Sequence, residues 1–511
     1  MKTNLVHLGA VCLLIGTLQI PAATLYVDVN STNPTPPYAD WNTAATNIQD
    51  AIDASTDGDL VLVTNGVYAT GGRVVYGALT NRVVVNKAVT VQSVNGPAAT
   101  SIVGNSTIGV SAVRCAFLVN GSLLSGFTLT NGGTLIVGDG YLEQCGGGVW
   151  TTNNSTATVS NCVLVGNAAT QYGGGAYYGN IINSSIIQNS AYYGGGVAFS
   201  SVTNSLALSN SAVAYGGATF SATMNNCKVF SNIANFGGGG YSSSYYGCLV
   251  VSNTALQLGG AMDSAQSIVN CTIVLNSSFQ GSGGVNTASG PNIYNNIIYF
   301  NTVSIGTASN YSGLASASYC CTTPMFKSSS SSGFNITNEP SFLDLANGDF
   351  HLKPESPCIN SGGLTARSPT DLDGNPRVAD GLLDIGAYES QTSKFVLPYY
   401  WAQQYGLPLD GSIDSDGDGL NNWQEAVIGT IPTNAASVLK FISVAKTPTN
   451  CVVRWQSAFN KIYFLQRSTN LAANPAFVSI YTNHPIPAPT LGYIDNSATN
   501  DGPYFYRVGV Q

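Results

Sequence analysis

The feature that most constrains the fold is a repeat of short apolar runs, each ending in asparagine. Seven runs follow one another, and their spacings are 22, 21, 22, 21, 23 and 25 residues. A period near 22, with two or three strand-like runs per repeat, is typical of a solenoid of stacked coils. One coil cannot bury its inward face alone, so its stability comes from its neighbours. The runs end at Asn167, Asn189, Asn210, Asn232, Asn253, Asn276 and Asn301.

Equivalent positions of adjacent coils lie above one another, at about 4.8 Å, so each repeated position predicts a ladder. The terminal asparagines are expected to chain their side-chain amides at a corner, where asparagine tolerates left-handed backbone. A second row of small residues indicates a narrow coil interior. Its thiols are expected to pack as buried small hydrophobes, because their parallel Cβ vectors disfavour disulfides. This row is Cys162, Ser184, Ser205, Cys227, Cys248, Cys271 and Asn296.

A third row of mostly aromatic residues precedes the glycine corners of the repeat. Exposed on an outer face, the rings would form a platform for sugars, whereas facing the protein they would serve packing. Packing is the more frequent role of such rows, but the sequence leaves both interpretations open. The candidate glycan-binding residues are Tyr172, Tyr193, Tyr215 and Phe236, with Leu258 next in the row.

The first residues predict export. Lys2 precedes an apolar stretch from Leu5 to Ile20, and Pro21-Ala22-Ala23 supplies small residues for cleavage, so residues 1–23 are expected to be a signal peptide. The stretch falls short of the roughly 20 residues that a bilayer span needs, and no later segment is a candidate span. We therefore expect a secreted or outer-surface protein. Only 17 basic residues, scattered along the chain against 25 acidic ones, argue against a nucleic-acid partner.

Residues 45–56 predict an amphipathic helix with Ala45, Ile48, Ala51 and Ile52 on one face, which would cap the open first coil. The segment IQDAIDASTDGDLVLVTNGVY resembles the entry segment of pectin-lyase-like right-handed β-helix proteins. The Gly-Gly tails and apolar runs ending in Asn are similar to polymorphic outer membrane protein repeats. Together these resemblances cover roughly residues 40–310. They imply an all-β, right-handed parallel β-helix over residues 24–319 with an N-terminal helical cap, and they imply no particular activity.

Residues 320–392 resemble the choice-of-anchor Q domain that closes bacterial surface β-helices, through NITNEPSFLDLANGDFHLKPESPCINSGG and DLDGNPRVADGLLDIGAYE. The resemblance implies an exported surface protein. In an oxidising compartment, Cys320 or Cys321 is expected to pair with Cys358, and the candidate pair is Cys321 with Cys358. The aspartates of DLDGNP and its surroundings are interpreted as turn formers rather than as a metal site.

Residues 393–437 carry the strongest chemical motif, DSDGDGLNNWQE, which fits the EF-hand loop pattern in full. An all-oxygen ligand set of this kind suits calcium, and the loop resembles thrombospondin type 3 or dockerin-like linkers. The sequences on both sides of the loop are expected to form short helices. Residues 438–511 alternate apolar and polar positions, which predicts a β-sandwich of the fibronectin type III kind. The expected calcium ligands are Asp414, Asp416, Asp418, the carbonyl of Leu420, Asn422 and Glu425.

The repeat region offers no evident acid–base machinery. Between residues 146 and 310 the only charged residues are Lys228 and Asp263, about one and a half repeats apart, and His351 further on is isolated. We therefore predict an exported non-catalytic β-helix that acts as an adhesin or binds a polysaccharide or cell-envelope component. The first alternative is a polysaccharide lyase or glycoside hydrolase with its site between Tyr68 and Glu143. The second is a passive surface spacer.

Overall fold

The computed structural model describes most of the chain. The residues described are 22–153, 156–287, 292–313, 317–326, 334–363, 367–379, 382–391, 395–458, 461–483 and 490–510. The predicted signal peptide lies almost wholly outside them, so its cleavage stays a prediction. Within the described residues, none of the helices combines the length and the apolar character needed to cross a membrane.

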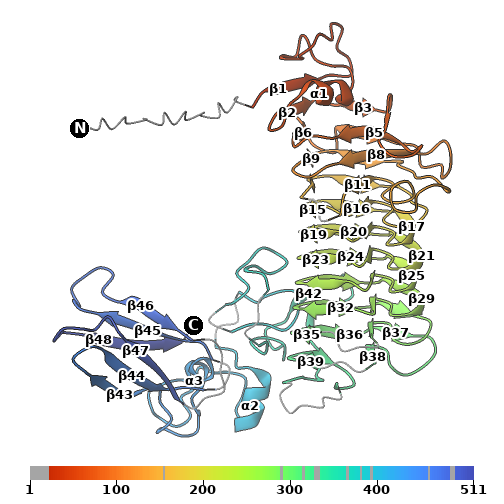
Figure 1. The fold of residues 1–511 in the computed structure, drawn as a ribbon. Helices are drawn as coiled ribbons and strands as arrows, with labels where there is room; N and C mark the ends of the chain where they lie inside the picture. The colour runs from red at the N-terminus through yellow and green to blue at the C-terminus, as the bar shows by residue number, and fades with distance from the viewer. Residues whose placement is uncertain are drawn as a thin grey trace, which may run out of the picture.

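Residues 24–322 form the expected right-handed parallel β-helix, which stands as a column of stacked coils in Figure 1. Three sheets, here called A, B and C, run along the column, and every strand pair in them is parallel except β4 with β5. Sheet A contains β1 (Thr24–Val27), β2 (Leu60–Val63), β6 (Thr90–Ser93), β9 (Leu123–Ser125), β12 (Thr158–Ser160), β15 (Asn180–Ile182), β19 (Ser201–Thr203), β23 (Thr223–Asn225), β27 (Ser244–Tyr246), β31 (Ser267–Val269), β35 (Asn292–Tyr294) and β39 (Ala317–Ser318).

Each coil passes from sheet A to sheet B, then through a connection to sheet C and back to sheet A. Sheet B contains β3 (Gly66–Tyr68), β7 (Thr100–Val103), β10 (Thr128–Thr130), β13 (Val163–Val165), β16 (Ser185–Ile187), β20 (Leu206–Leu208), β24 (Lys228–Phe230), β28 (Leu249–Val251), β32 (Thr272–Val274), β36 (Ile297–Tyr299) and β40 (Cys321–Thr322). Sheet C contains β4 (Arg73–Val74), β5 (Thr80–Val85), β8 (Val113–Leu118), β11 (Val149–Thr151), β14 (Ala176–Tyr177), β18 (Val197–Ala198), β22 (Thr219–Phe220), β26 (Gly240–Tyr241), β30 (Met262–Asp263), β34 (Val285–Asn286) and β38 (Tyr311–Ser312).

The connection between sheets B and C forms a short fourth ladder, sheet D, beside the main column. It carries most of the predicted aromatic row at its end. Its strands are β17 (Ser190–Tyr193), β21 (Ser211–Tyr215), β25 (Ile233–Phe236), β29 (Thr254–Leu258), β33 (Ser277–Ser278) and β37 (Thr302–Val303).

The asparagine ladder is confirmed, with one correction to its backbone. The Asn189 amide nitrogen donates to Asn210 Oδ1 at 3.0 Å, and the Asn210 amide donates to Asn232 Oδ1 at 2.9 Å. Left-handed backbone occurs one residue before the ladder position, as at Gln188 and Ser209, and not at the ladder asparagines. The physical reason is that the preceding residue makes the bend, which turns the next side chain inward where its amide bonds to the coils on either side.

The small-residue row is also confirmed as interior packing. Cys227, Cys248 and Cys271 are fully buried free thiols in the central core. The serines of the row satisfy the backbone of the neighbouring coil, since the Cys162 N–H donates to Ser184 Oγ at 3.1 Å. The left-handed residue at this corner is usually asparagine. The interior therefore holds small groups whose polar atoms bond along the column.

The N-terminal cap is the short helix α1 (Ile48–Ala54), and Ile48, Ala51 and Ile52 are buried as predicted. The Asn47 side chain caps its first turn by accepting from Asp50 N–H. Lys87 Nζ donates to the carbonyls of the last turn, at 2.9 Å from Ile52 O. The helix thus covers the first coil with both of its ends satisfied.

After the last coil, the chain folds back along the outside of the column. Its strands β41 (Phe342–Asp344) and β42 (Asp349–Leu352) pair in antiparallel fashion, and residues 342–388 pack on outward apolar residues of sheet B. Ala387 N–H donates to Thr272 Oγ1 at 3.0 Å across 115 residues of sequence. The segment predicted to close the β-helix therefore contacts coils far upstream of its end.

The C-terminal part contains two helices and two three-stranded antiparallel sheets. Helices α2 (Tyr399–Tyr405) and α3 (Asn422–Ile428) flank the acidic loop, as expected. The two sheets share a core around Trp455 and Leu465 and lie to one side of the β-helix in Figure 1. A relation to fibronectin type III stays a prediction. The strands are β43 (Phe441–Lys446), β44 (Cys451–Gln456) and β47 (Thr490–Asp495) in one sheet, and β45 (Tyr463–Ser468), β46 (Val478–Thr482) and β48 (Phe505–Val510) in the other.

Candidate calcium loop and outer surfaces of the β-helix

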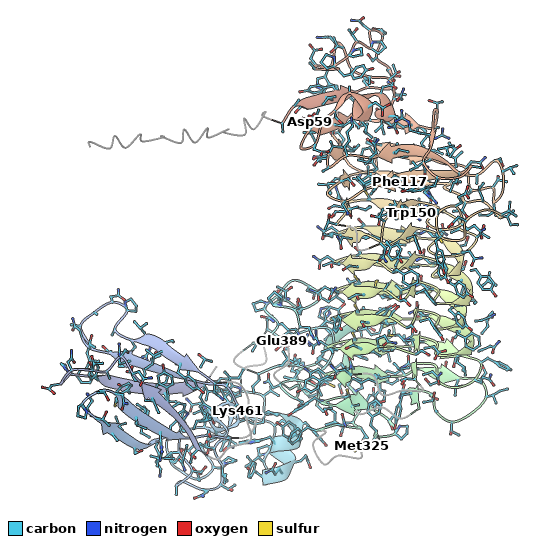
Figure 2. All side chains as sticks on the ribbon, viewed as in Figure 1. Asp59, Phe117, Trp150, Met325, Glu389 and Lys461 are labelled. Carbon is cyan, nitrogen blue, oxygen red and sulfur yellow. The ribbon has the colours of Figure 1, made fainter. Side chains whose placement is uncertain are left out.

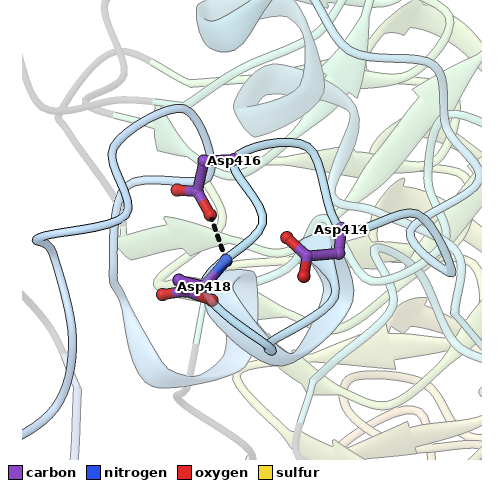
Figure 3. A group of neighbouring side chains, drawn as sticks. All are labelled: Asp414, Asp416 and Asp418. Carbon is purple, nitrogen blue, oxygen red and sulfur yellow. Dashed lines mark hydrogen bonds between the residues drawn. The ribbon is translucent and has the colours of Figure 1, made fainter.

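The acidic loop brings three carboxylates together. One ligand oxygen from each of Asp414, Asp416 and Asp418 lies within 4.8 Å of the others, as Figure 3 shows. The tight turn needs left-handed backbone at Gly417 and Gly419, with φ of 77° and 96°, which glycine adopts without strain. Asp414 accepts from the N–H groups of both glycines, at 2.7 and 3.0 Å. The loop is therefore organised by its own backbone around a cluster of like charges.

Carboxylate oxygens of this loop are buried without a hydrogen-bond donor. They are Oδ2 of Asp416, Oδ2 of Asp418 and Oε2 of Glu425. Burial and the charges of the three aspartates raise the pKa of Glu425 to about 7. A buried acceptor without a partner costs about 1–3 kcal/mol, and more if it is charged. A single cation with oxygen ligands could bind all three of these unpaired oxygens.

The remaining expected ligands lie on or beside α3. Asn422 and Glu425 are fully buried, and Asn422 Nδ2 donates to Ser415 Oγ at 2.9 Å, which fastens the helix to the loop. Asn421 begins the helix with a reciprocal capping box to Gln424. Among the described residues, the oxygens that lie within 4.8 Å of one another belong to the three aspartates. Glu425 is outside this group, but it is buried close enough for the charges of the aspartates to raise its pKa. The hard, all-oxygen donor set fits calcium.

Helix α3 also connects the loop to the C-terminal sheets. Lys461 Nζ donates to the carbonyl of Ala426 at 2.5 Å, and the Tyr463 hydroxyl donates to the carbonyl of Ile428 at 2.9 Å. Lys461 lies in Figure 2 where the C-terminal sheets approach the helical linker. The helix that carries Glu425 therefore also anchors the C-terminal sheets, through the carbonyls of Ala426 and Ile428.

The predicted aromatic row is a continuous stack on the outside of the column. Ring centroids are 4.9 Å apart for Tyr172 and Tyr193, and 5.5 Å for Tyr193 and Tyr215, with interplanar angles of 24° and 7°. Phe236 continues the row at 5.3 Å from Tyr215. Each face is used by the next ring, whereas a sugar platform needs free faces. The geometry favours packing, and glycan binding by these residues stays untested.

A second aromatic row, which sequence reasoning missed, lies beneath the first on the outer face of sheet C. Phe117 stacks on Trp150 at 5.1 Å, and both are buried (Figure 2). The two rows interlock, because Tyr193 contacts Phe220 at 5.3 Å. The signal was present as an aromatic residue in the short tails after several of the glycine runs, as at Trp150, Tyr177 and Phe220, but its outward direction required the register. The row is Phe117, Trp150, Tyr177, Ala198, Phe220 and Tyr241, so Ala198 interrupts its aromatic residues.

The basic residues of the first coils are engaged in structural contacts. Arg114 is fully buried, bonds to Asn81 Oδ1 and three backbone carbonyls, and lies 5.9 Å from the centre of the Trp150 ring. Arg73 pairs with Asp53, and Arg82 donates to the carbonyls of Val103 and Gly71. The three arginines of this region therefore all have structural partners.

His351 is not isolated, which corrects the interpretation from sequence. Its Nδ1 lies 2.5 Å from Asp349 Oδ1 and its Nε2 lies 2.7 Å from Asp373 Oδ2. Burial lowers the pKa of His351, but the bonds to Asp373 and Asp349 outweigh it and raise the pKa above its ordinary value. The three residues come from β42 and a loop 22 positions later, so sequence distance concealed the contact. Together they form an acidic cluster bridged by an imidazole.

The cysteine pair is resolved by the direction of the two adjacent side chains. Cys320 belongs to the interior core, whereas Cys321 faces outward into the same cluster as Cys358. Cys321 and Cys358 are both buried free thiols in the structure, and their side chains are in hydrogen-bond contact. Cys321 is therefore the neighbour of Cys358, and a disulfide between them stays a prediction.

The likeness of this chain to known proteins is distant. No family model matches the chain, and no curated protein matches it either. Among solved structures, the chain is similar to the crystal structure of pectate lyase Pel9A, with 14% sequence identity, 72% of this chain covered, 96% of that chain covered and a TM-score of 0.46.

Proposed function

We propose that this protein is an exported, non-catalytic β-helix whose C-terminal sheets are held by a calcium-dependent joint. The observation that carries the proposal is the acidic loop, in which Asp416, Asp418 and Glu425 each keep a buried carboxylate oxygen without a donor. Helix α3 passes from this loop to the carbonyls that bond Lys461 and Tyr463. An ion that fixes Glu425 would fix the helix, and with it the attachment of the sandwich.

Calorimetric titration of the full mature protein with calcium tests the joint. We expect one bound ion per chain and binding weakened by about tenfold or more in Glu425→Gln. Asp501→Asn is the matched control, since Asp501 is exposed in the last loop. No calcium uptake by the wild-type protein would contradict the proposal. Adding a panel of acidic and neutral polysaccharides to the same preparation tests the non-catalytic part, because cleavage of any member would favour the lyase or hydrolase alternative.

A second proposal is adhesion through the loops at the N-terminal end of the column. Three loops between sheet strands pack side by side, with Gly109 N–H donating to Thr134 O at 3.1 Å and Ala78 N–H donating to Glu143 Oε1 at 2.5 Å. Their tips expose an unusual number of apolar side chains, and such patches mark interaction surfaces. The exposed residues are Val74, Tyr76, Ile108, Val110, Ile136, Val137 and Tyr141.

Binding of the protein to envelope fractions or immobilised polysaccharides tests the adhesive surface. The double variant Val110→Ser and Ile136→Ser should abolish adhesion without lowering the unfolding temperature, because both side chains are exposed, at 96% and 61%. Leu471→Ser, exposed at 52% in the C-terminal part, is the control. Undiminished adhesion of the double variant would mean that the adhesive surface lies elsewhere. If the wild-type protein does not adhere, the passive spacer becomes the favoured function.

A further inference from the structure

A polar cleft of about 520 Å³ lies between the β-helix and the loop of residues 368–374. Its floor is the corner between sheets A and B, where Asn183, Asn204 and Asn226 stand one coil apart in left-handed backbone with φ near 50°. The side chains of Asn183 and Asn204 are exposed, and their amides make no hydrogen bond within the described part of the chain. Repeated amides at coil spacing therefore point to a regular, hydrogen-bonding floor.

The loop that forms the other wall is firmly attached. Asn226 Nδ2 donates to Ser368 Oγ at 3.1 Å, and the Arg367 guanidinium lies 5.0 Å from the centre of the Tyr246 ring. The buried carboxylate of Asp371 accepts from the N–H groups of Asp373, Asn375 and Glu389, at 2.8 to 3.0 Å. The cleft is thus preformed, and a ligand does not have to order its walls.

One basic and two acidic side chains line the cleft, Lys228, Asp371 and Asp373, and both carboxylates are already engaged by other groups of the protein. Lys228, on the floor, is half-buried, and its ammonium makes no ion pair among the described residues. Asp371 accepts from three backbone N–H groups, and Asp373 bonds His351 through Oδ2. Because both carboxylates are engaged, Lys228 is the one cation of the lining that has no ion pair among the described residues.

The size of the cleft and its lining residues indicate which uncharged groups the ligand carries. The floor spans two coil steps, about 10 Å at about 4.8 Å each, and the volume lies within the range of small-molecule sites. The amides, together with the hydroxyls of Ser185 and Thr370, both donate and accept, as sugar hydroxyls require. Leu206 and Leu372 add a small apolar surface. This combination matches a disaccharide better than an extended apolar molecule.

We propose that this cleft binds a short saccharide that carries one anionic group, with Lys228 at the anion and the corner asparagines at the hydroxyls. The site lies on the corner between sheets A and B, away from the aromatic rows of sheets C and D, and it is independent of the calcium loop.

Calorimetry of the full mature protein in saturating calcium tests the proposal with three matched probes: cellobiose, cellobiouronic acid and cellobiose sulfate. At least one of the two anionic probes should bind tenfold or more tightly than cellobiose, and which one binds identifies the anionic group. Lys228→Met should remove this preference and leave the weaker binding of cellobiose unchanged. Asn204→Gly, which keeps the left-handed backbone, should weaken all ligands severalfold.

Lys440→Met, an exposed lysine in the C-terminal part, is the control for charge removal. Thermal unfolding of each variant verifies that it is folded. Equal binding of the anionic probes by Lys228→Met and the wild type would overturn the role of Lys228. Failure of all three probes to bind the folded, calcium-loaded protein would overturn the site itself.

Discussion

The carboxylate of Glu425 accepts a hydrogen bond from the hydroxyl of Thr430 at 3.1 Å through Oε1, while its Oε2 is buried without a donor. One oxygen thus holds the carboxylate in place and the other is free to face the loop. Substitutions of Glu425 and Thr430 can therefore distinguish the ligand from the residue that orients it. The Glu425→Gln change removes a ligand charge, whereas Thr430→Val removes only the bond that orients the ligand.

We predict that Glu425→Gln lowers calcium affinity by about tenfold or more, since affinity follows the charge of the ligand set. Thr430→Val should lower it less, because the carboxylate remains. Terbium luminescence, read against calcium competition, ranks the two variants. Equal affinities in both variants and the wild type would remove Glu425 from the site.

The asparagine ladder predicts a large loss of stability on truncation of a middle member. Asn210 Oδ1 accepts from both the backbone and the side-chain amide of Asn189, and its own amide donates to Ile186 O and Asn232 Oδ1. Asn210→Ala leaves these buried groups unpaired, at about 1–3 kcal/mol each, so we expect a loss of about 3 kcal/mol or more in the free energy of unfolding. Denaturant unfolding measures the loss.

The exposed Asn42 provides the reference for the ladder. Asn42→Ala should change the free energy of unfolding by less than about 0.5 kcal/mol, as is usual for surface positions. A similar small change for Asn210→Ala would mean that the amide ladder contributes little to the column.

The register of the column could be predicted from sequence because each coil repeats the one below. The Asn and Cys rows are read directly from a spacing near 22, and the stacking direction follows. The approach of residues 368–374 to the coil of Lys228 could not be predicted from sequence. It joins positions about 140 residues apart, because the chain folds back along the outside of the column. The choice between Cys320 and Cys321 likewise required knowing which side chain of β40 faces inward.

Stability should fall as the pH rises from about 4 to 9. Burial raises the pKa of Asp384 and of Glu389, which share the neighbourhood of the buried Arg377. Because the folded-state pKa lies above the unfolded value of about 4, the protonated form favours folding, and this contribution is lost as pH rises through the folded pKa. The raised pKa of His351 acts in the same direction.

Thermal unfolding at several pH values measures this slope, and Glu389→Gln should reduce it, since the amide does not titrate. Asp501, which is exposed, serves as the control, and Asp501→Asn should leave the slope unchanged. An unfolding temperature that rises across the same interval would contradict the raised pKa values of the buried acids.

Oxidation should link Cys321 to Cys358 and leave Cys320 as a thiol. The side chains of Cys321 and Cys358 are already in contact, whereas Cys320 lies in the interior core. Alkylation of the unfolded, non-reduced protein followed by mass spectrometry identifies the pair. A peptide linked through Cys320, or three alkylated cysteines after oxidation, would contradict the assignment.

The most direct test of the calcium joint is hydrogen exchange of the full mature protein, measured with calcium and with a chelator. The account predicts that calcium slows exchange tenfold or more in the loop and α3, residues 414–428, and also slows it at the start of β45 near Tyr463, with the coils between residues 163 and 278 unchanged. Identical exchange in both conditions, or protection confined to the β-helix, would contradict it.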